Sequence, residues 1–416
     1  MSLESELKAF ARSIGVDHLG IAAAEPFAEE EALLFAEREA GRYPAFAERR
    51  IPLRCRPQEL LPGARSIISV AISYLTDDPA HPPRPDARPR GWLSRYAWGL
   101  DYHPILHRKL EQITAFLRAH APPPVECRPY VDTGPPLDRA VAARAGLGWF
   151  GKNSCIYVPG HGSWVFLAEI LTTVPLQPDP VRKKSCGSCD LCLRACPTQA
   201  IIAPFRIDPT RCISHLTQID GFIPRPLRRA IGRRLFGCDV CQAVCPWNKG
   251  ALSANRPEFR PTEALGARPD LIRILLMTKS EFKQLFGPTP MGWRGKKILQ
   301  RNAAICLGNI GDPAAVPPLT DRLLRDAKPI VRGHCAWALG EIGGEDARRA
   351  LLTARASEQD ERVIEEIDAA LAAIDVTRGR SSPSPPATPL PPPPLPARTS
   401  GAGRATPRRD SPRATC

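Results

Sequence analysis

The feature that most constrains this chain is a concentration of cysteine, because eight of its fourteen cysteines fall within residues 186–245. The first four follow the spacing C-x2-C-x2-C-x3-C and precede Pro197; they are Cys186, Cys189, Cys192 and Cys196. Three closely spaced thiolates can hold three irons of one 4Fe–4S cubane, whereas a fourth cysteine beyond a turn points to a neighbouring cluster. This run predicts iron–sulfur chemistry.

A second run contains Cys238, Cys241 and Cys245, again followed by proline, and Cys212 lies between the runs. Eight thiolates are what two 4Fe–4S clusters require. We assign one cluster to Cys186, Cys189, Cys192 and Cys245, and the other to Cys196, Cys212, Cys238 and Cys241. A pair of structural zinc sites is the alternative, since zinc also accepts four cysteines, but the spacing with its trailing prolines favours iron–sulfur. The six scattered cysteines are expected to be structural.

Composition and charge indicate where such a protein works. The chain has no run of eighteen apolar residues and no apolar segment near its start, so we expect no membrane association and a cytoplasmic location. Thiols stay reduced there, which favours metal ligation over disulfides. The net charge of +14 suggests an anionic partner such as nucleic acid, although a basic surface can also serve solubility alone.

The length of 416 residues allows several domains, and the expected fold class is α+β multidomain. We expect an α/β domain at 1–175, a ferredoxin-like two-cluster domain at 176–250, a basic linker at 251–297, HEAT-like helical repeats at 298–376 and a disordered Pro- and Arg-rich tail at 377–416. The cluster domain has few large apolar side chains, so metal clusters are expected to hold it together.

The N-terminal domain alternates helical and strand patterns. Helices are predicted at Leu3–Ile14, Asp101–His120 and Leu137–Ala145, strands at Val16–Ala23, Arg65–Leu75 and Val125–Val131, and a hairpin from Ser154–Val158 and Trp164–Thr172. A Pro- and Arg-rich loop at His81–Arg90 interrupts this domain. Gly146, Gly148 and Gly151 fit the dinucleotide fingerprint G-x-G-x-x-G, but they follow a helix and lead into a strand, which disfavours that interpretation.

A repeat begins near residue 298. The segment AICLGNIG (304–311) matches AWALGEIG (336–343) at a shift of 32 residues, and the small and apolar positions continue at the same shift. Such a period predicts stacked helical pairs, each burying its apolar face on the next. Chance similarity between two Ala- and Leu-rich helices is the alternative.

Several segments together resemble the epoxyqueuosine reductase family over residues 1–375. They are Val131–Arg139, AGLGWFGKNS (145–154), SRYAWGLDYH (Ser94–His103), RCISHLTQ (Arg211–Gln218), FGCDVCQAVCPWN (Phe236–Asn248) and the CGSCDLC run. The resemblance implies a cobalamin-dependent enzyme that reduces the epoxide of epoxyqueuosine at the tRNA wobble position to queuosine. Its electrons would pass from an external low-potential donor through the two clusters, and we expect a monomer.

The resemblance also implies roles for individual residues. Asp132 matches the catalytic aspartate, and a carboxyl in an apolar pocket could have its pKa raised enough to donate a proton. Its alternative role is to cap the following helix, and Asp138 is expected to be a helix N-terminal charge. His103 and His215 are candidate cobalt ligands but more often such residues pack. The implied cobalamin contacts are Arg54, Ser94, Arg95, Tyr96, Asp132, Ile156, Leu167, Ser214, Asp239 and Val240.

Two basic segments are candidates for the RNA interface. Residues 292–297 interleave an aromatic side chain, glycines and cations, and 225–234 form a second basic run between the cluster cysteines. Cations neutralise phosphates, and Trp or Arg can stack on an unpaired base. The expected RNA contacts are Arg229, Trp293, Arg294, Lys296, Lys297 and Arg301. A solvated cationic face is the alternative.

Two other functions remain open from the sequence. One is a cobalamin-dependent reductase of a small organic substrate, and it is disfavoured by the basic repeat domain and by the lack of a twin-arginine signal. The other is a non-catalytic iron–sulfur electron carrier, which would not need the large N-terminal domain.

Overall fold

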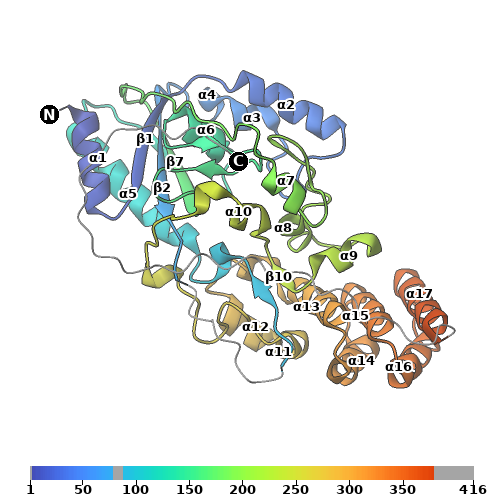
Figure 1. Cartoon of the computed structure of the whole chain (residues 1–416). Helices are drawn as coiled ribbons and strands as arrows, with labels where there is room; N and C mark the ends of the chain where they lie inside the picture. Colours follow the sequence, from blue (N-terminus) through green and yellow to red (C-terminus); the bar gives the residue numbers. More distant parts are fainter. Residues whose placement is uncertain (1, 78–87, 379–416) are drawn as a thin grey trace, which may run out of the picture.

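The computed structural model describes residues 2–77 and 88–378 (Figure 1). Most of the expected His81–Arg90 loop and nearly all of the expected disordered tail at 377–416 lie outside these residues. Thr377 and Arg378, assigned to the tail from the sequence, belong to the last helix. Among the described helices, none combines the length and the apolar character needed to span a membrane.

The N-terminal region is built on one four-stranded sheet. Its strands are β1 (His18–Ala23), β2 (Ser66–Ser73), β7 (Val165–Thr172) and β4 (Cys127–Tyr130), in that order. Every neighbouring pair is antiparallel. The expected α/β arrangement of this domain is therefore wrong in detail, since parallel strands with crossover helices define that class.

Helices cover both faces of this sheet. The helices α1 (Leu3–Ser13) and α5 (Tyr102–His120) bury their apolar stripes on one face. The helix α6 (Asp138–Arg144) packs on the other face, and α2 (Ala28–Glu39), α3 (Ile51–Cys55) and α4 (Pro57–Leu60) adjoin it (Figure 1). The predicted helices and strands of this region are confirmed within a few residues, because their apolar periods match the observed burial.

The predicted hairpin is wrong. The short strand β6 (Ile156–Tyr157) pairs with β5 (Trp149–Phe150), and only an isolated bridge between Val158 and Gly162 closes the turn. The physical reason is that β7 lies inside the sheet, so both of its edges are already paired with β2 and β4. The glycines do follow a helix and lead into strands, as expected: Gly146 and Gly148 lie between α6 and β5, and Gly151 lies between β5 and β6.

The cysteine-rich region consists of short elements. They are α7 (Leu191–Ala195), β8 (Ile201–Ala203), β9 (Arg206–Ile207), α8 (Ile213–Leu216), α9 (Arg225–Ile231), β10 (Arg234–Phe236) and α10 (Val240–Ala243). The strand β10 pairs in parallel with β3 (Trp92–Leu93) from the N-terminal region. The helices α11 (Leu271–Leu276) and α12 (Lys279–Phe286) follow before the repeats.

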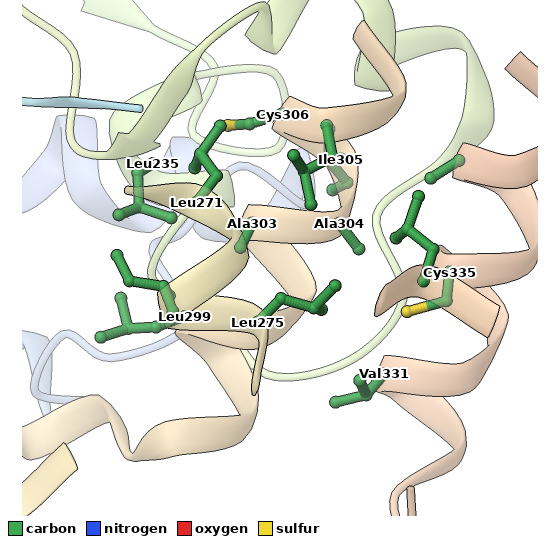
Figure 2. Packing of buried hydrophobic residues seen from close by; sticks show 14 of the residues in the cluster. Leu235, Leu271, Leu275, Leu299, Ala303, Ala304, Ile305, Cys306, Val331 and Cys335 are labelled. Atoms are coloured by element: carbon green, nitrogen blue, oxygen red, sulfur yellow. The ribbon is translucent and has the colours of Figure 1, made fainter. Parts of the chain in front are cut away.

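A single buried apolar cluster joins the cysteine-rich region to the C-terminal helices. Leu235 from β10, Leu271 and Leu275 from α11, and Leu299 from the first repeat helix pack together in Figure 2. Leu216 of α8 belongs to the same cluster. The expectation that the cysteine-rich region lacks a core is therefore wrong: its apolar residues share a core with the helices that follow it.

The C-terminal helices form an antiparallel stack (Figure 1). They are α13 (Lys296–Ile310), α14 (Val316–Arg325), α15 (Pro329–Ile342), α16 (Glu345–Arg355) and α17 (Glu361–Arg378). The 32-residue repeat has a direct packing cause at two glycines. A Cβ on Gly308 would lie 2.9 Å from the Cα of Ala338, and a Cβ on Gly340 would lie 2.7 Å from the Cβ of Ala370. Gly308 therefore lets α13 approach α15 closely, and Gly340 lets α15 approach α17 closely.

We expect Gly308→Ala to lower the free energy of unfolding. Alanine favours the helix by about 1 kcal/mol over glycine, but overpacking at this contact costs about 1–3 kcal/mol. Gly340→Ala should lower the free energy of unfolding in the same way. Leu352→Ala, at an exposed helical position, should change it by no more than about 0.5 kcal/mol relative to the wild type. Urea unfolding measures the difference, and a Gly308→Ala protein more stable than the wild type would contradict this packing.

Candidate active site

The predicted ligands of the first cluster lie near one another. Burial raises the pKa of Cys245, and the neighbouring Cys186 and Cys189 act in the same direction. Burial likewise raises the pKa of Cys192 to about 11, with Cys241, Cys245 and Cys186 as neighbours. The four residues assigned to this cluster therefore meet across the short helix α7 and the segment after α10.

The predicted ligands of the second cluster also converge. Burial raises the pKa of Cys212, and the thiols of Cys241 and Cys196 contribute. Burial raises the pKa of Cys238 to about 12, again with Cys241 as a neighbour. Across residues 2–77 and 88–378, no group of three His, Cys, Asp or Glu side chains is gathered tightly enough for a single metal ion. The ligand assignment itself stays a prediction.

A ninth cysteine lies at the cluster region, which the sequence did not indicate. Cys155 is hydrogen bonded to Cys241, and this contact lowers the pKa of Cys155. Cys155 also packs with the core group of Trp149, Tyr157 and Cys245. This packing agrees with the expected structural role of Cys155, and the strand pair β5–β6 also brings it near Cys241 of the second set of thiols.

Asp132 follows β4 in the left-handed backbone region, with a φ of 46°. The hydroxyl of Tyr102 donates a hydrogen bond of 2.6 Å to its Oδ2. The Nε2 of His103 lies 3.7 Å from the same oxygen, which is an ion-pair distance and longer than a hydrogen bond. The carboxylate side chain remains 58% exposed. It is therefore held by two side chains while open to an incoming ligand.

His103 connects Asp132 to a second carboxylate. Its Nδ1 lies 2.7 Å from Oδ1 of Asp101, the residue that caps α5. Burial alone would lower the pKa of His103, but its interactions with Asp101 and Asp132 outweigh burial and raise the pKa to about 9. At neutral pH His103 is therefore an imidazolium between two carboxylates. This contact argues against His103 as a cobalt ligand, because both of its nitrogens face acids.

The expected raised pKa of Asp132 is wrong. Burial acts in that direction, but the ion pair with His103 and the hydrogen bond from Tyr102 prevail and lower the pKa. The proton at this site is consequently carried by His103. The alternative role for Asp132, as a helix cap, also fails, because Leu137 occupies the N-cap of α6 and no side chain caps it. Asp138 does lie in the first turn of α6, as expected.

Several predicted cobalamin contacts converge on Asp239. Its carboxylate accepts a short hydrogen bond from the Ser94 hydroxyl and a 2.8 Å hydrogen bond from the backbone N–H of Arg95. Burial raises the pKa of Asp239 despite these bonds. Gly237 permits this approach, since a Cβ there would lie 2.5 Å from the Cβ of Ser94.

Tyr96 links the predicted cofactor contacts to the rest of the site. It is half-buried, and burial raises the pKa of its hydroxyl, to which the charges of Asp132, Asp239 and Cys212 contribute. Arg54 donates a hydrogen bond to the carbonyl of Pro135, three residues after Asp132. The other predicted contacts are the buried Ile156 and the half-buried Leu167, Ser214 and Val240.

The cavities found in the structure lie elsewhere. One of about 840 Å³ lies between α14 and α16, with Pro313, Val316 and Ala350 among its lining residues. None of its lining residues belongs to the predicted site.

The structure contradicts the prediction that Arg301 contacts RNA. Arg301 is fully buried, and its guanidinium donates hydrogen bonds to the carbonyls of Leu216, Ile219 and Gly221. A buried cation is stable only with such partners. Arg301 therefore fastens α13 to the cysteine-rich region.

Most of the second basic run also serves packing. Arg228 is buried and donates to both carboxylate oxygens of Glu366 on α17. Arg229 is exposed but pairs with Glu341 on α15. Among the other predicted RNA contacts, Lys297 pairs with Asp220 and Lys296 donates to Gln300. Arg228, Arg229 and Lys297 are therefore neutralised within the chain, whereas Lys296 has only a neutral amide as its partner.

Trp293 and Arg294 retain the character expected of an RNA contact. Trp293 is 58% exposed, and the Arg294 guanidinium lies 4.3 Å from its ring centroid. Phe46 approaches Trp293 edge-on at 6.0 Å and packs on His215 at 5.0 Å. We call these four residues the aromatic surface; it joins segments far apart in the sequence. His215 also accepts a hydrogen bond from the backbone N–H of Ala45, as a packing residue would.

Two functional candidates, Tyr102 and Glu169, escaped the sequence reasoning, and His103 was considered only as a cobalt ligand. Tyr102 and His103 end the motif SRYAWGLDYH, but the sequence does not show that both face Asp132. Their position at the start of α5 in the folded chain shows it. Glu169 is the single ionisable residue of β7 and is fully buried. A lone acid in an otherwise apolar strand was a signal that could have identified it.

Comparison with protein families gives three matches along the chain. Residues 54–133 match the family model "Epoxyqueuosine reductase QueG, DUF1730". Residues 185–248 match a 4Fe–4S double cluster binding domain, which supports iron over zinc for the cysteines. Residues 295–372 match HEAT repeats, in agreement with the 32-residue period.

Known relatives extend over nearly the whole chain. Epoxyqueuosine reductase of Bacillus cereus is 40% identical over 89% of this chain and 97% of its own length. The Bacillus subtilis enzyme is 41% identical over 88% of this chain and 94% of its own. A crystal structure of an epoxyqueuosine reductase with an epoxyqueuosine-modified tRNA stem loop superposes with a TM-score of 0.86 at 40% identity, covering 90% of this chain and 99% of that one.

We expect Asp101→Asn to lower the pKa of His103 by about one unit or more, because one of two neighbouring carboxylates is lost. NMR titration of the imidazole measures this change, and Asp346→Asn, at an exposed position, should leave the pKa unaltered. By linkage, the ion pairs of His103 stabilise the fold fully below pH 6.5 and lose that contribution as pH rises through about 9. A His103 that titrates normally in the wild type would contradict the arrangement.

Proposed function

The chain belongs to the epoxyqueuosine reductase family, and we propose how its residues reduce epoxyqueuosine in tRNA to queuosine. It is a tRNA-modifying oxidoreductase with a 4Fe–4S binding domain. The reaction breaks both carbon–oxygen bonds of the epoxide, forms a carbon–carbon double bond and releases the oxygen as water. It consumes two electrons and two protons. The observation that carries the proposal is the Asp132–Tyr102–His103 group beside the converging cysteines.

The electrons enter through two clusters in the assignment predicted from the sequence. The neighbouring thiols support this assignment, since Cys245 lies with Cys186 and Cys189, and Cys212 with Cys196. Cys192 and Cys241 are neighbours across the two sets, so the clusters would lie close enough to exchange electrons. An external low-potential donor supplies the first cluster.

Cobalamin fits the region between the second cluster and Asp132. A broad corrin needs an apolar contact surface together with hydrogen-bonding groups at its edge. Leu167 and Ile156 supply apolar contact, while Ser94, Arg95 and Asp239 form a buried polar network. When bound, the cofactor would supply a reduced cobalt that opens the epoxide.

The chain supplies the proton at Asp132. His103 holds a proton at neutral pH, and Asp132 lies between it and the open face of the site. The proton would pass from Nε2 of His103 to Oδ2 of Asp132 and on to the epoxide oxygen as negative charge develops there. Tyr102 fixes the carboxylate through its 2.6 Å hydrogen bond.

The aromatic surface would bind the tRNA. Exposed Trp293 and Phe46 offer ring faces for unpaired bases, and Arg294 adds charge for the phosphates. Arg229, Lys296 and Lys297 could add phosphate contacts only by exchanging their present partners. The reaction would take place in the cytoplasm, where tRNA is found, and the monomeric state remains a prediction. A small-substrate reductase and an electron carrier are not favoured by the relatives.

We expect Asp132→Asn to lower turnover about 100-fold or more, because an amide cannot pass on a proton. Protein reconstituted anaerobically with iron, sulfide and cobalamin should retain its cluster content and its affinity for tRNA. Asp346→Asn is the control, as an exposed aspartate outside the site. Wild-type turnover by Asp132→Asn would refute the role of the carboxylate, and zinc in place of iron would refute the clusters.

Trp293→Ala should weaken binding of an epoxyqueuosine-modified stem loop by about 1–3 kcal/mol, the range of base stacking on an aromatic ring. Leu324→Ala, another exposed apolar side chain, should bind like the wild type. Fluorescence anisotropy at fixed salt measures both. Unchanged binding by Trp293→Ala would remove the aromatic surface from the interface.

A further inference from the structure

Glu169 occupies the middle of the central strand β7 with none of its surface exposed. It lies in a row across the sheet, opposite Ser69 on β2 and Tyr130 on β4, and Ser69 in turn pairs with Gly20 on β1. This row faces α6, because a Cβ on Gly20 would lie 2.1 Å from the carbonyl oxygen of Ala145. Glu169 therefore points into the layer between the sheet and α6.

That layer is otherwise apolar. Leu171, Val141 and Ala142 are among its buried residues. Within the described chain, neither carboxylate oxygen of Glu169 has a partner with full hydrogen-bond geometry, and the same is true of the Ser69 hydroxyl. The carboxyl of Asp138, at the start of α6, nevertheless lies close enough to interact with that of Glu169. A fully buried acid and a half-buried acid thus meet at the start of α6.

Charges around this carboxyl pair require it to keep a proton. Burial raises the pKa of Glu169 well above its ordinary value, and Asp138 and Asp132 raise it further. Burial also raises the pKa of Asp138 to about 6. The cation facing the pair is Arg139, which favours ionisation of Asp138 but donates its hydrogen bond to the Ser154 carbonyl. Of the two acids, Glu169 therefore holds a proton more tightly than Asp138.

The pair is close enough to the site already described to be influenced by its charge. Glu169 lies opposite Tyr130, two residues before Asp132, and the charge of Asp132 acts on both members of the pair. Asp138 is half-buried, so it is the member of the pair that solvent can reach.

We propose that Glu169 and Asp138 form a proton store that supplies the second proton of epoxide reduction. This inference rests on the proposed function, in which His103 and Asp132 deliver only one of the two protons that the departing oxygen needs. The Glu169 proton would move to the Asp138 carboxylate and from there to Asp132 once it has given up its first proton. No electrons are transferred in this step, and solvent reprotonates the pair through Asp138.

A purely structural role makes a different expectation. The pair would then only fasten the first turn of α6 to β7, and Glu169→Gln would preserve that contact, because an amide can donate the same hydrogen bond. Neither residue is placed against the substrate, so the pair would act through Asp132 by supplying its proton. Variants that keep the side-chain shape but remove the acid, such as Glu169→Gln and Asp138→Asn, therefore distinguish proton storage from packing.

The first experiment observes the proton itself. Infrared spectra of the full-length wild type at neutral pH should contain the carbonyl stretch of a protonated carboxylic acid that shifts in heavy water. Glu169→Gln should lose this band, whereas Glu111→Gln, an exposed residue of α5, should keep it. The absence of such a band in the wild type would overturn the proposal. This measurement on the wild type does not depend on a variant that folds or on enzyme turnover.

The second experiment measures single-turnover epoxide reduction in reconstituted enzyme across pH. Glu169→Gln and Asp138→Asn should each slow the reaction about tenfold or more, while cluster content and tRNA affinity hold. Both should also lose one ionisation from the alkaline limb of the pH profile. Wild-type rates and an unchanged profile in both variants would reduce the pair to a packing contact. If the wild type itself failed to reduce the epoxide, the proposed function would fall, while the infrared result would stand separately.

Discussion

The arrangement of this protein depends on a buried cation, the guanidinium of Arg301. It has no carboxylate partner in the described chain and is stabilised by hydrogen bonds to the carbonyls of Leu216, Ile219 and Gly221. Asn302 adds bonds to the carbonyls of Thr217 and Leu235. Leaving these groups unpaired would cost several kcal/mol. The first repeat helix is therefore part of the support for the cysteine-rich region, which explains why the two share one core.

Charge is arranged differently on the two sides of Asp132. On one side, His103 is held as a cation between Asp101 and Asp132. On the other, Glu169 is kept neutral in an apolar layer beside Asp138. The same fold thus favours one proton by ion pairing and a second proton by desolvation, which are two of the three physical causes of a pKa shift in proteins. Both lie along β4, β7 and the start of α5, which are rigid elements of the sheet domain.

The sequence predicted elements and ligand types better than it predicted contacts. Cysteine spacing identified the cluster region, and the 32-residue period identified the stacked helices, because both depend on local pattern. Arg301 shows the limit: a cation in a basic run resembles an RNA contact until the core around it is known. The ionisation of Asp132 was also out of reach, since it depends on Tyr102 and His103 facing it across the fold.

The backbone of Asp132 has a further consequence. A non-glycine residue at a φ of 46° is held in a conformation that costs of order 1–3 kcal/mol. The segment carrying Asp132 can therefore lower its free energy by leaving this conformation. Cofactor and tRNA would then bind most tightly to the strained arrangement. The fraction of molecules with Asp132 positioned in the site would then depend on whether the ligands are bound.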